Sequence, residues 1–311
     1  MKSGSNLEKV LQAGHFAVTA ELGPPMGCNA EVVQKKIQLL GGVADAYNVT
    51  DCQTAVVRMS SIATSIFLVQ SGLEPVMQMT CRDRNRIAMQ SDILGAAAHG
   101  IKNCLCIAGD HQSFGAAGKL KGHPGAKNVY DVDSIQLVGI LKGLRDEARQ
   151  QGGDPLDGRA PLFIGAAWTP LGDPVEIRTM RLAKKVNAGA DFVQTQAVFD
   201  IERFSEAMKK ARDRGLHERV AILAGIIVPK SGGMLAYMNE SVPGVTVPEG
   251  LIRRMKGASD PKAEGVAIAI ELVQQIKQIE GVRGVHIQAI EWEAAVRSVV
   301  EGAGLLPRPK L

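Results

Sequence analysis

The sequence predicts an α/β fold, a (β/α)8 TIM barrel that forms a single domain over residues 1–311. Two observations lead to this prediction. Short β-branched segments alternate with helical patterns almost throughout the chain and make up eight strand–helix units, which is typical of a parallel barrel of this length. In addition, no Gly-x-Gly-x-x-Gly motif follows the first strand. The sequence therefore supports the alternative fold, a doubly wound open sheet, less well than the barrel.

The first four units follow one another along the chain with short connections. Asn29 can cap the helix after the first strand, because its side chain accepts hydrogen bonds from free N–H groups of the first turn. Apolar Val33 and Ile37 then lie on one face of that helix. Another helix is predicted to begin near Arg84 and to stop at Gly100, a usual helix terminator. The predicted strands of these units are 16–22, 45–50, 74–79 and 104–108.

The last four units include longer connections. The predicted strands are 161–167, 192–195, 220–228 and 284–288. The predicted helices are 134–150, 175–187, 201–214 and 292–301, with two or three extra helices at about 231–280. Residues 111–130 form a long loop after the fourth strand, and we expect an active-site loop there because long loops in compact domains are usually functional. Residues 151–160 lie at the opposite end of the barrel and are predicted to be a connector.

Composition excludes several classes of protein. The net charge is +4, without a basic run or interleaved aromatic residues, so a nucleic-acid partner is not expected. The sequence contains no run of about 18 apolar residues that could span a membrane, and its first residues lack the apolar core of a signal peptide. The five cysteines are an odd number in a long chain, so we expect a reducing, cytoplasmic location.

The carboxyl ends of the eight strands meet at one mouth in such a barrel, and ligands bind there. The residues predicted at this mouth are Glu21, Thr50, Thr80, Asp110, Trp168, Gln196, Pro229 and Gln288. Gln196 follows a short buried strand, and a neutral amide at this place suits a neutral ring of donors and acceptors such as a pterin. The alternative is an ordinary polar residue at a strand end.

Two of these residues are carboxylates. Glu21 lies in an apolar strand, where ionisation is costly, so its pKa should rise and suit a general acid. The alternative is a glutamate that points outwards and pairs with an arginine. Asp110 follows Gly109 at a tight strand exit, where it could act at the site or serve as a cap or turn residue.

Other groups near the mouth carry weaker signals. Cys28, Cys52 and Cys81 each follow one of the first three strands and could form a metal or redox site. Their spacing is not that of a zinc motif, so we expect free thiols and no metal. The segment 118–122 places two lysines between glycines and could approach a phosphate, although it is not a P-loop.

These motifs, taken in order, resemble the 5,10-methylenetetrahydrofolate reductase family over nearly the whole chain. Each motif is weak alone, but together and at the expected strands they are specific. The matching motifs are Glu21-Leu-Gly-Pro24-Pro25, Val49-Thr50, Thr80-Cys81 and Gly109-Asp110. A further match is the block of residues 188–200, which contains Ala-Gly-Ala-Asp, Thr-Gln and Phe-Asp in this order.

The resemblance implies a barrel that binds FAD, or FMN, and in which reduced flavin passes a hydride to the methylene carbon of 5,10-methylenetetrahydrofolate, giving 5-methyltetrahydrofolate. By matching position, Glu21 would be the general acid, Asp110 would lie near flavin and pterin, and Gln196 would bind the pterin. The residues that fall where the family contacts its cofactor are Thr50, Gln78, Gly109, Asp110, Trp168, Arg181, Lys184 and Lys185.

The chain departs from the family pattern at two places. Gln78 stands where a histidine is usual, and Leu235 and Asn239 replace the glutamine and phenylalanine that hold NADH, unless Tyr237 substitutes. The electron donor is therefore NAD(P)H or another redox protein. Some anaerobic members work with a second, metal-carrying subunit, and we expect an oligomer. The alternative functions are a pterin-binding methyltransferase on the same barrel and a non-catalytic barrel subunit of a redox complex.

Overall fold

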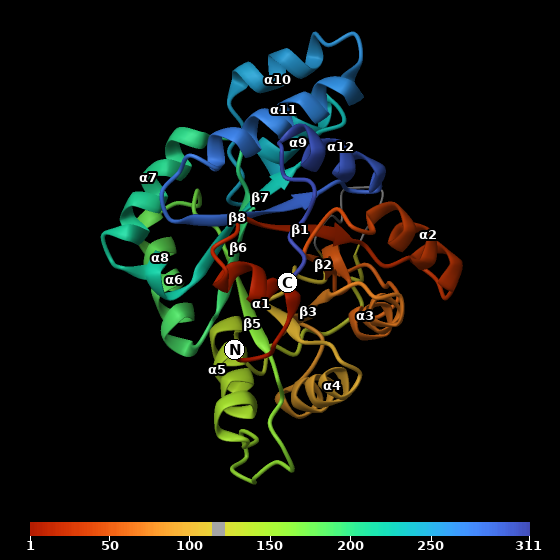
Figure 1. Cartoon of the computed structure of the whole chain (residues 1–311), viewed down its shortest axis with the longest axis vertical. Helices are drawn as coiled ribbons and strands as arrows, with labels where there is room; N and C mark the ends of the chain where they lie inside the picture. Colours follow the sequence, from red (N-terminus) through yellow and green to blue (C-terminus); the bar gives the residue numbers. More distant parts are fainter. Residues whose placement is uncertain (114–121) are drawn as a thin grey trace.

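The computed structural model describes residues 1–113 and 122–311 and shows a closed barrel of eight parallel strands. Each strand pairs with the next along the chain, and β8 closes the barrel on β1 (Figure 1). The strands are β1 (Ala17–Leu22), β2 (Ala46–Val49), β3 (Pro75–Thr80), β4 (Asn103–Ile107), β5 (Phe163–Trp168), β6 (Phe192–Ala197), β7 (Ala221–Ile227) and β8 (Val282–Gln288). The predicted (β/α)8 barrel is therefore confirmed.

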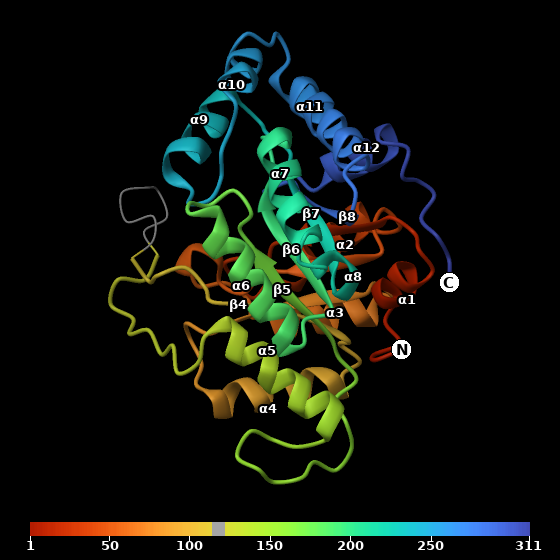
Figure 2. The same ribbon diagram turned by 90° about the vertical axis from the view of Figure 1, so that its left-hand side faces the viewer.

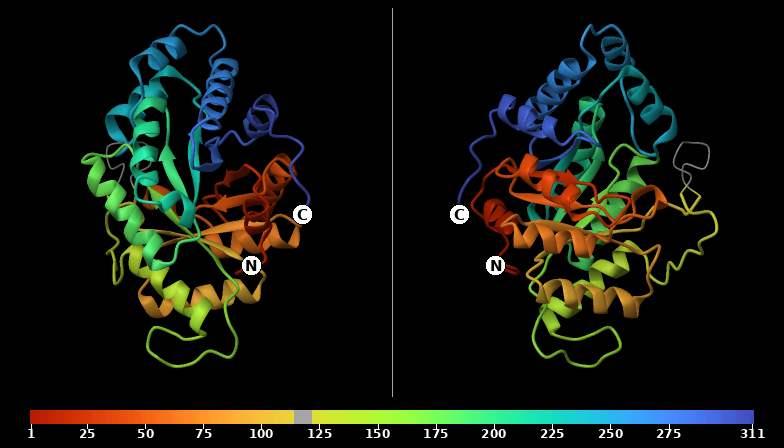
Figure 3. Two further views of the ribbon diagram at one scale, coloured as in Figure 1. Left: turned by 60° about the vertical axis from the view of Figure 1, so that its left-hand side comes forward. Right: turned by 90° about the vertical axis from the view of Figure 1, so that its right-hand side faces the viewer.

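Helices surround the barrel, as the views in Figures 2 and 3 show. They are α1 (Asn6–Gln12), α2 (Ala30–Leu40), α3 (Ser61–Gln70), α4 (Arg86–Ala98), α5 (Ser134–Lys142), α6 (Val175–Ala188), α7 (Ile201–Arg212), α8 (Leu216–Arg219), α9 (Gly232–Ser241), α10 (Glu249–Lys256), α11 (Pro261–Ile276) and α12 (Ala294–Gly302), with short turns η1 (Gln53–Ala55) and η2 (Gly143–Glu147). The expected extra helices are α9, α10 and α11, which lie between β7 and β8 in the chain. No helix of the described residues is long and apolar enough to cross a membrane.

The amino-terminal end of the barrel is filled by an apolar cluster. Inward-facing side chains of seven strands pack there against α1, a helix that we did not predict. The cluster consists of Leu7, Val10 and Leu11 of α1 with Ala17, Ala46, Val76, Leu105, Phe163, Phe192 and Leu223. Phe163 and Phe192 stack with their ring centroids 5.2 Å apart. Gly165 makes room for this pair, because a Cβ there would lie 2.3 Å from the Phe192 ring.

One predicted helix ends earlier than expected. The helix that begins at Ser134, capped by a reciprocal Asp133–Gln136 box, ends at Lys142 and continues only as the turn η2. Ala148 then adopts a left-handed backbone with φ of 49°, which breaks the helical path. The following residues turn back through a bridge between Arg149 and Pro155, so the predicted end at Gln150 is wrong.

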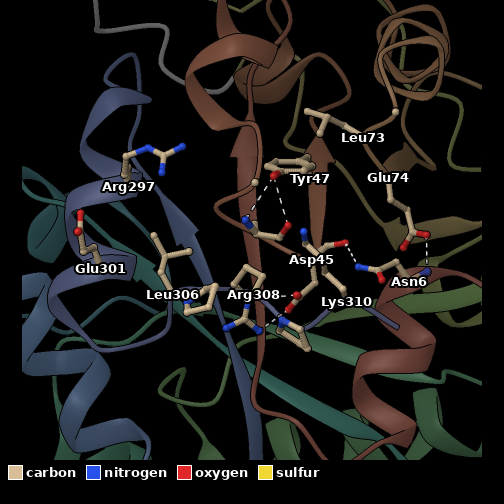
Figure 4. A pocket seen from close by; sticks show the side chains of 15 residues that line it. Asn6, Asp45, Tyr47, Leu73, Glu74, Arg297, Glu301, Leu306, Arg308 and Lys310 are labelled. Carbon is tan, nitrogen blue, oxygen red and sulfur yellow. Dashed lines mark hydrogen bonds and ion pairs between the residues drawn. The ribbon is translucent and has the colours of Figure 1, made fainter.

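A cavity of about 680 Å³ lies at the amino-terminal end, away from the predicted site (Figure 4). Its polar side chains already have partners within the protein. Arg308 donates to the Asp45 carboxylate at 2.6 Å, the Tyr47 hydroxyl donates to a carbonyl at 2.7 Å, and the Asn6 amide donates to the Asp45 carbonyl at 2.9 Å. The Arg308 contact joins the carboxyl-terminal tail to the barrel, and this end of a (β/α)8 barrel usually serves stability.

Candidate active site

Two smaller cavities open at the carboxyl ends of the strands, where the sequence placed the site. The first, about 230 Å³, is lined by Glu21 and by the loops after β1 and β8. The second, about 180 Å³, is lined by strand-end residues that include Gln78, Trp168, Gln196 and Gln288. The fold therefore brings several of the predicted residues to the same mouth.

Glu21 is a half-buried acid of unusual pKa. It pairs in register with Asn48 of β2. Burial, and secondarily the negative charge of Glu293, raise the pKa of the Glu21 carboxyl to about 7, while Lys36 and Arg58 partly offset this rise. A carboxyl group with this pKa carries its proton in about half of the molecules at neutral pH, as a general acid requires.

The loop after β1 is fixed around Glu21 by the same two cations. The Lys36 ammonium donates to the Gly23 carbonyl at 2.9 Å and lies 2.5 Å from a Glu293 carboxylate oxygen. The Arg58 guanidinium donates to the Pro24 carbonyl at 3.1 Å. Neither cation forms an ion pair with Glu21 within salt-bridge distance, so the alternative of an outward glutamate paired with an arginine is wrong.

Asp110 is exposed and holds the loop after β2. Its Oδ2 accepts a hydrogen bond from the Thr54 backbone N–H at 2.9 Å. Gly109 has a φ of 87°, and a Cβ there would lie 3.0 Å from Thr80, so this tight turn requires glycine. The Arg82 guanidinium donates to the Asp110 carbonyl at 3.0 Å and to the Cys52 carbonyl at 3.1 Å. Asp110 thus holds this turn, and its Oδ1 has no hydrogen-bond partner among the described residues.

Gln196 sits at an irregular point of the barrel. The register between β6 and β7 shifts between Gln194 and Ala197. The Thr195 hydroxyl donates to the Gln196 carbonyl at 2.8 Å and accepts from the Gly225 N–H at 2.9 Å. The Gln196 amide oxygen receives a long contact of 3.3 Å from the Ala197 backbone N–H, the one hydrogen bond of this side chain among the described residues, and Gln196 lines the second cavity.

A polar layer lies beneath this mouth, and the sequence analysis assigned it no role. The amides of Asn48 and Gln194 bond to each other at 2.6 and 3.0 Å, and Gln194 also donates to the Thr19 hydroxyl at 3.0 Å. Thr19 in turn contacts the Nδ1 atom of His286 at 3.0 Å. The four residues come from four strands, so the closed barrel is needed to recognise them as one group.

The remaining predicted cofactor residues are less closely gathered. Thr50 is buried and its hydroxyl donates to Gln53 at 2.7 Å. Arg181 and Lys184 are exposed on α6, and neither lines the two mouth cavities. Lys185 is buried between α6 and β5, where its ammonium donates to the Ala167 carbonyl. Burial, and secondarily Arg181, lower the pKa of Lys185 to about 8.

The expected NADH-binding positions have structural roles here. Leu235 is fully buried in the core, and the Asn239 side chain accepts a hydrogen bond from the Val247 N–H at 2.9 Å. Tyr237, by contrast, is 55% exposed on α9. Two of the three residues are therefore committed to the packing of this helix.

The three cysteines near the mouth differ in their surroundings. Cys28 is exposed, Cys52 is half-buried and Cys81 is buried, where burial raises the pKa of its thiol to about 12. Within residues 1–113 and 122–311, no three histidine, cysteine or acidic side chains are grouped as a metal site would need. The lysines of segment 118–122 lie outside the described residues.

These observations define a (β/α)8-barrel protein with a protonatable carboxyl group next to an amide-lined cavity at its mouth. Residues 6–304 match the family model of methylenetetrahydrofolate reductase. The chain belongs to the methylenetetrahydrofolate reductase family.

Individual relatives are distant. The chain is 24% identical over 246 residues to 5,10-methylenetetrahydrofolate reductase of Salmonella typhimurium, covering 76% of this chain and 73% of that protein. It is 23% identical over 254 residues to the probable methylenetetrahydrofolate reductase (NADPH) of Caenorhabditis elegans, covering 79% of this chain but 34% of that protein. The chain thus spans about a third of the length of such eukaryotic relatives.

A solved structure shares the fold. It is a Clostridium thermocellum protein described as binding two copies of 5-methyl-5,6,7,8-tetrahydrofolic acid. The two structures agree with a TM-score of 0.66 at 15% identity, and the match covers 97% of this chain and all of the other. At this identity the likeness establishes the common fold.

Proposed function

We propose that this protein reduces 5,10-methylenetetrahydrofolate to 5-methyltetrahydrofolate with a hydride from a bound reduced flavin. The observation that carries the proposal is the pKa of about 7 at Glu21, at the mouth of a barrel of this family. The folate bound by the Clostridium thermocellum protein of the same fold supports a folate substrate.

The residues of the second mouth cavity fit a flavin, either FAD or FMN. Gln78 and Trp168 line it, and the buried indole nitrogen of Trp168 has no partner among the described residues, which suits a ring with acceptor atoms. Thr50, Gly109 and Asp110 would hold the cofactor from the neighbouring loops, with Arg181, Lys184 and Lys185 of α6 nearest to its phosphates. When bound, the flavin supplies the hydride.

Two side chains act on the folate in this proposal. Glu21 delivers a proton to the ring nitrogen that leaves the methylene carbon, which opens the five-membered ring so that the carbon can accept a hydride. Gln196 pairs with the pterin edge through its amide, whose donors and oxygen are largely unused within the protein. Lys36 and Arg58 hold the loop after β1 beside Glu21 through the Gly23 and Pro24 carbonyls.

The electron donor in this proposal is a redox protein or a second, metal-carrying subunit rather than NAD(P)H. Leu235 and Asn239 are used for packing α9, so neither is free to hold a nicotinamide. Rapid mixing of the flavin-loaded chain with NADH tests this point. Flavin bleaching within the turnover time would show direct use of NADH, whereas bleaching only after a partner is added would support the relay.

The visible spectrum of the purified chain tests the proposal as a whole. We expect flavin absorption bands, either at once or after addition of FAD or FMN, and reoxidation of the reduced flavin by methylenetetrahydrofolate. A clean preparation that binds neither flavin would refute the reductase proposal. Folate binding without flavin would instead favour a pterin-binding methyltransferase.

A further inference from the structure

One guanidinium group joins the three loops that follow β2, β3 and β4. Arg82, in the loop after β3, has 3% of its surface exposed. Its Nη1 donates to the Asp110 carbonyl after β4 at 3.0 Å, and its Nη2 donates to the Cys52 carbonyl after β2 at 3.1 Å. The Asp83 carboxylate accepts from Nε at 2.7 Å and from Nη2 at 2.6 Å, so the charge is balanced within the loop after β3.

The loop after β2 has a strained backbone. Cys52, Thr54 and Ala55 have φ values of 45°, 55° and 57°. Such left-handed values are uncommon for residues other than glycine and least favourable for a β-branched side chain such as that of Thr54. Strain of this kind persists only where surrounding contacts hold it, and it is frequent at functional sites. The conformation of segment 52–55 therefore depends on its contacts with other loops.

Hydrogen bonds from the neighbouring loops hold this strained segment. Arg82 donates to the carbonyl of Cys52, and Asp110 Oδ2 accepts from the Thr54 N–H at 2.9 Å. Because Arg82 also donates to the Asp110 carbonyl, it holds the segment both directly and through Asp110. A hydrogen bond from an ionised donor is stronger than one between neutral groups, so Arg82 provides the stronger of these contacts.

Segment 52–55 contacts both sides of the candidate active site. Gln53 lines the cavity of about 230 Å³ that contains Glu21. The next residue, Thr54, is bonded to the Asp110 carboxylate. A change in the backbone of this segment would therefore displace groups beside the proposed acid and beside Asp110 at the same time.

We propose that Arg82 is a positioning residue that holds the loops after β2, β3 and β4 as one unit and thereby fixes Gln53 and Asp110 relative to Glu21. Its effect on turnover rests on the proposed function, whereas its effect on the loop does not. The planar fork of arginine reaches acceptors of all three loops at once, and a lysine ammonium supplies the charge without this geometry. The role therefore depends on the shape of the group as well as on its charge.

The Cys52 thiol reports the state of this loop without any ligand. Alkylation of the ligand-free chain is followed at each cysteine by mass spectrometry, in a Cys28→Ser background that removes an exposed thiol. Arg82→Met and Arg82→Lys should each speed alkylation of Cys52 about 10- to 100-fold, because hydrogen bonds from a charged donor are lost. Arg254→Met is the matched control and should leave the rate unchanged, because Arg254 also pairs with carboxylates but between the outer helices α10 and α11.

Two thiols buried in β4 separate release of the loop from loss of the fold. Cys104 and Cys106 are buried and should stay unreactive in both Arg82 variants. Equal acceleration at Cys52, Cys104 and Cys106 would show that Arg82 only stabilises the fold, and would overturn the inference. A wild-type rate at Cys52 in Arg82→Lys would also overturn it, because the charge alone would then be sufficient.

Steady-state kinetics connect the loop with the reaction. Arg82→Lys should lower kcat for folate reduction about 10- to 100-fold and change KM less, because small displacements of positioned groups slow a reaction steeply. Release of the loop with unchanged kcat would overturn the positioning role. A wild-type chain that binds neither flavin nor folate would refute the proposed function instead, and the alkylation rates would still decide whether Arg82 holds the loop.

Discussion

Replacing Glu21 by glutamine should slow folate reduction strongly and yet stabilise the protein at alkaline pH. The substitution keeps the shape of the side chain and removes both the transferable proton and the buried charge. Folate reduction should slow by about 10²–10⁴-fold, the usual contribution of a general acid, which is roughly 3–5 kcal/mol of barrier. Flavin binding and flavin reduction by a donor should hardly change, because neither needs a proton delivered to the folate.

The stability effect follows from the pKa of Glu21, which rises from 4.5 to about 7. At about 1.4 kcal/mol per pKa unit, ionising Glu21 in the folded protein costs about 3 kcal/mol, and partial exposure reduces this to about 2 kcal/mol. Below pH 4.5 the carboxyl group is protonated in both the folded and the unfolded chain, so no penalty applies. As the pH rises towards 7, the unfolded chain loses the proton first and the folded protein loses stability.

Denaturant unfolding and stopped-flow kinetics together check this reasoning. Glu21→Gln should gain about 2 kcal/mol over wild type at pH 8 and much less at pH 5, whereas the exposed control Glu240→Gln should show no such trend. Wild-type folate reduction should fall as the pH rises above 7. If the Glu21→Gln variant reduced folate at the wild-type rate, another group would be the acid. If the stability difference between this variant and the wild type were the same at pH 5 and pH 8, the pKa of Glu21 would not be raised by burial.

Three further changes test other parts of the molecule. Asp110→Asn should raise the flavin reduction potential, because a carboxylate near the ring disfavours the anionic reduced form; an unchanged potential in spectroelectrochemistry would place Asp110 away from the flavin. Gln196→Ala should weaken folate binding by about 0.5–1.5 kcal/mol per lost contact and affect flavin less, and equal folate affinity would contradict its role. Leu7→Ala should cost about 2–5 kcal/mol of unfolding free energy without changing flavin affinity, and a loss of flavin binding would contradict the separation of the two barrel ends.

The eight strands could be predicted because their signal is local. Each is a short apolar segment bounded by polar or glycine-rich turns, and Asn29 does cap α2, its side chain accepting from the Glu31 N–H. The helix α1 could not be predicted in the same way. It has seven residues, too few to be stable alone. It is stabilised by the packing of Leu7 and Val10 into the amino-terminal end of the barrel, which the sequence alone does not reveal.

The polar layer illustrates a different limit of sequence reasoning. Strands of a parallel barrel are buried on both faces, so they lack the alternation that would reveal which residues point inwards. Asn48, Gln194 and His286 each precede a predicted mouth residue by two positions, but that spacing becomes informative only after the barrel register is known. The rise of the Glu21 pKa was predicted from its apolar strand, whereas the contribution of Glu293 depends on the loop after β8.

The polar layer is compatible with an acid of high pKa at the mouth, which burial and Glu293 produce. Thr19, Asn48 and Gln194 bond to one another, and no hydrogen bond from this layer contributes to the pKa of Glu21. A carboxylate that accepted one of those donors would be stabilised in its charged form. Because these polar groups bond to one another, they do not stabilise the charged form of Glu21, and its carboxyl group keeps a raised pKa.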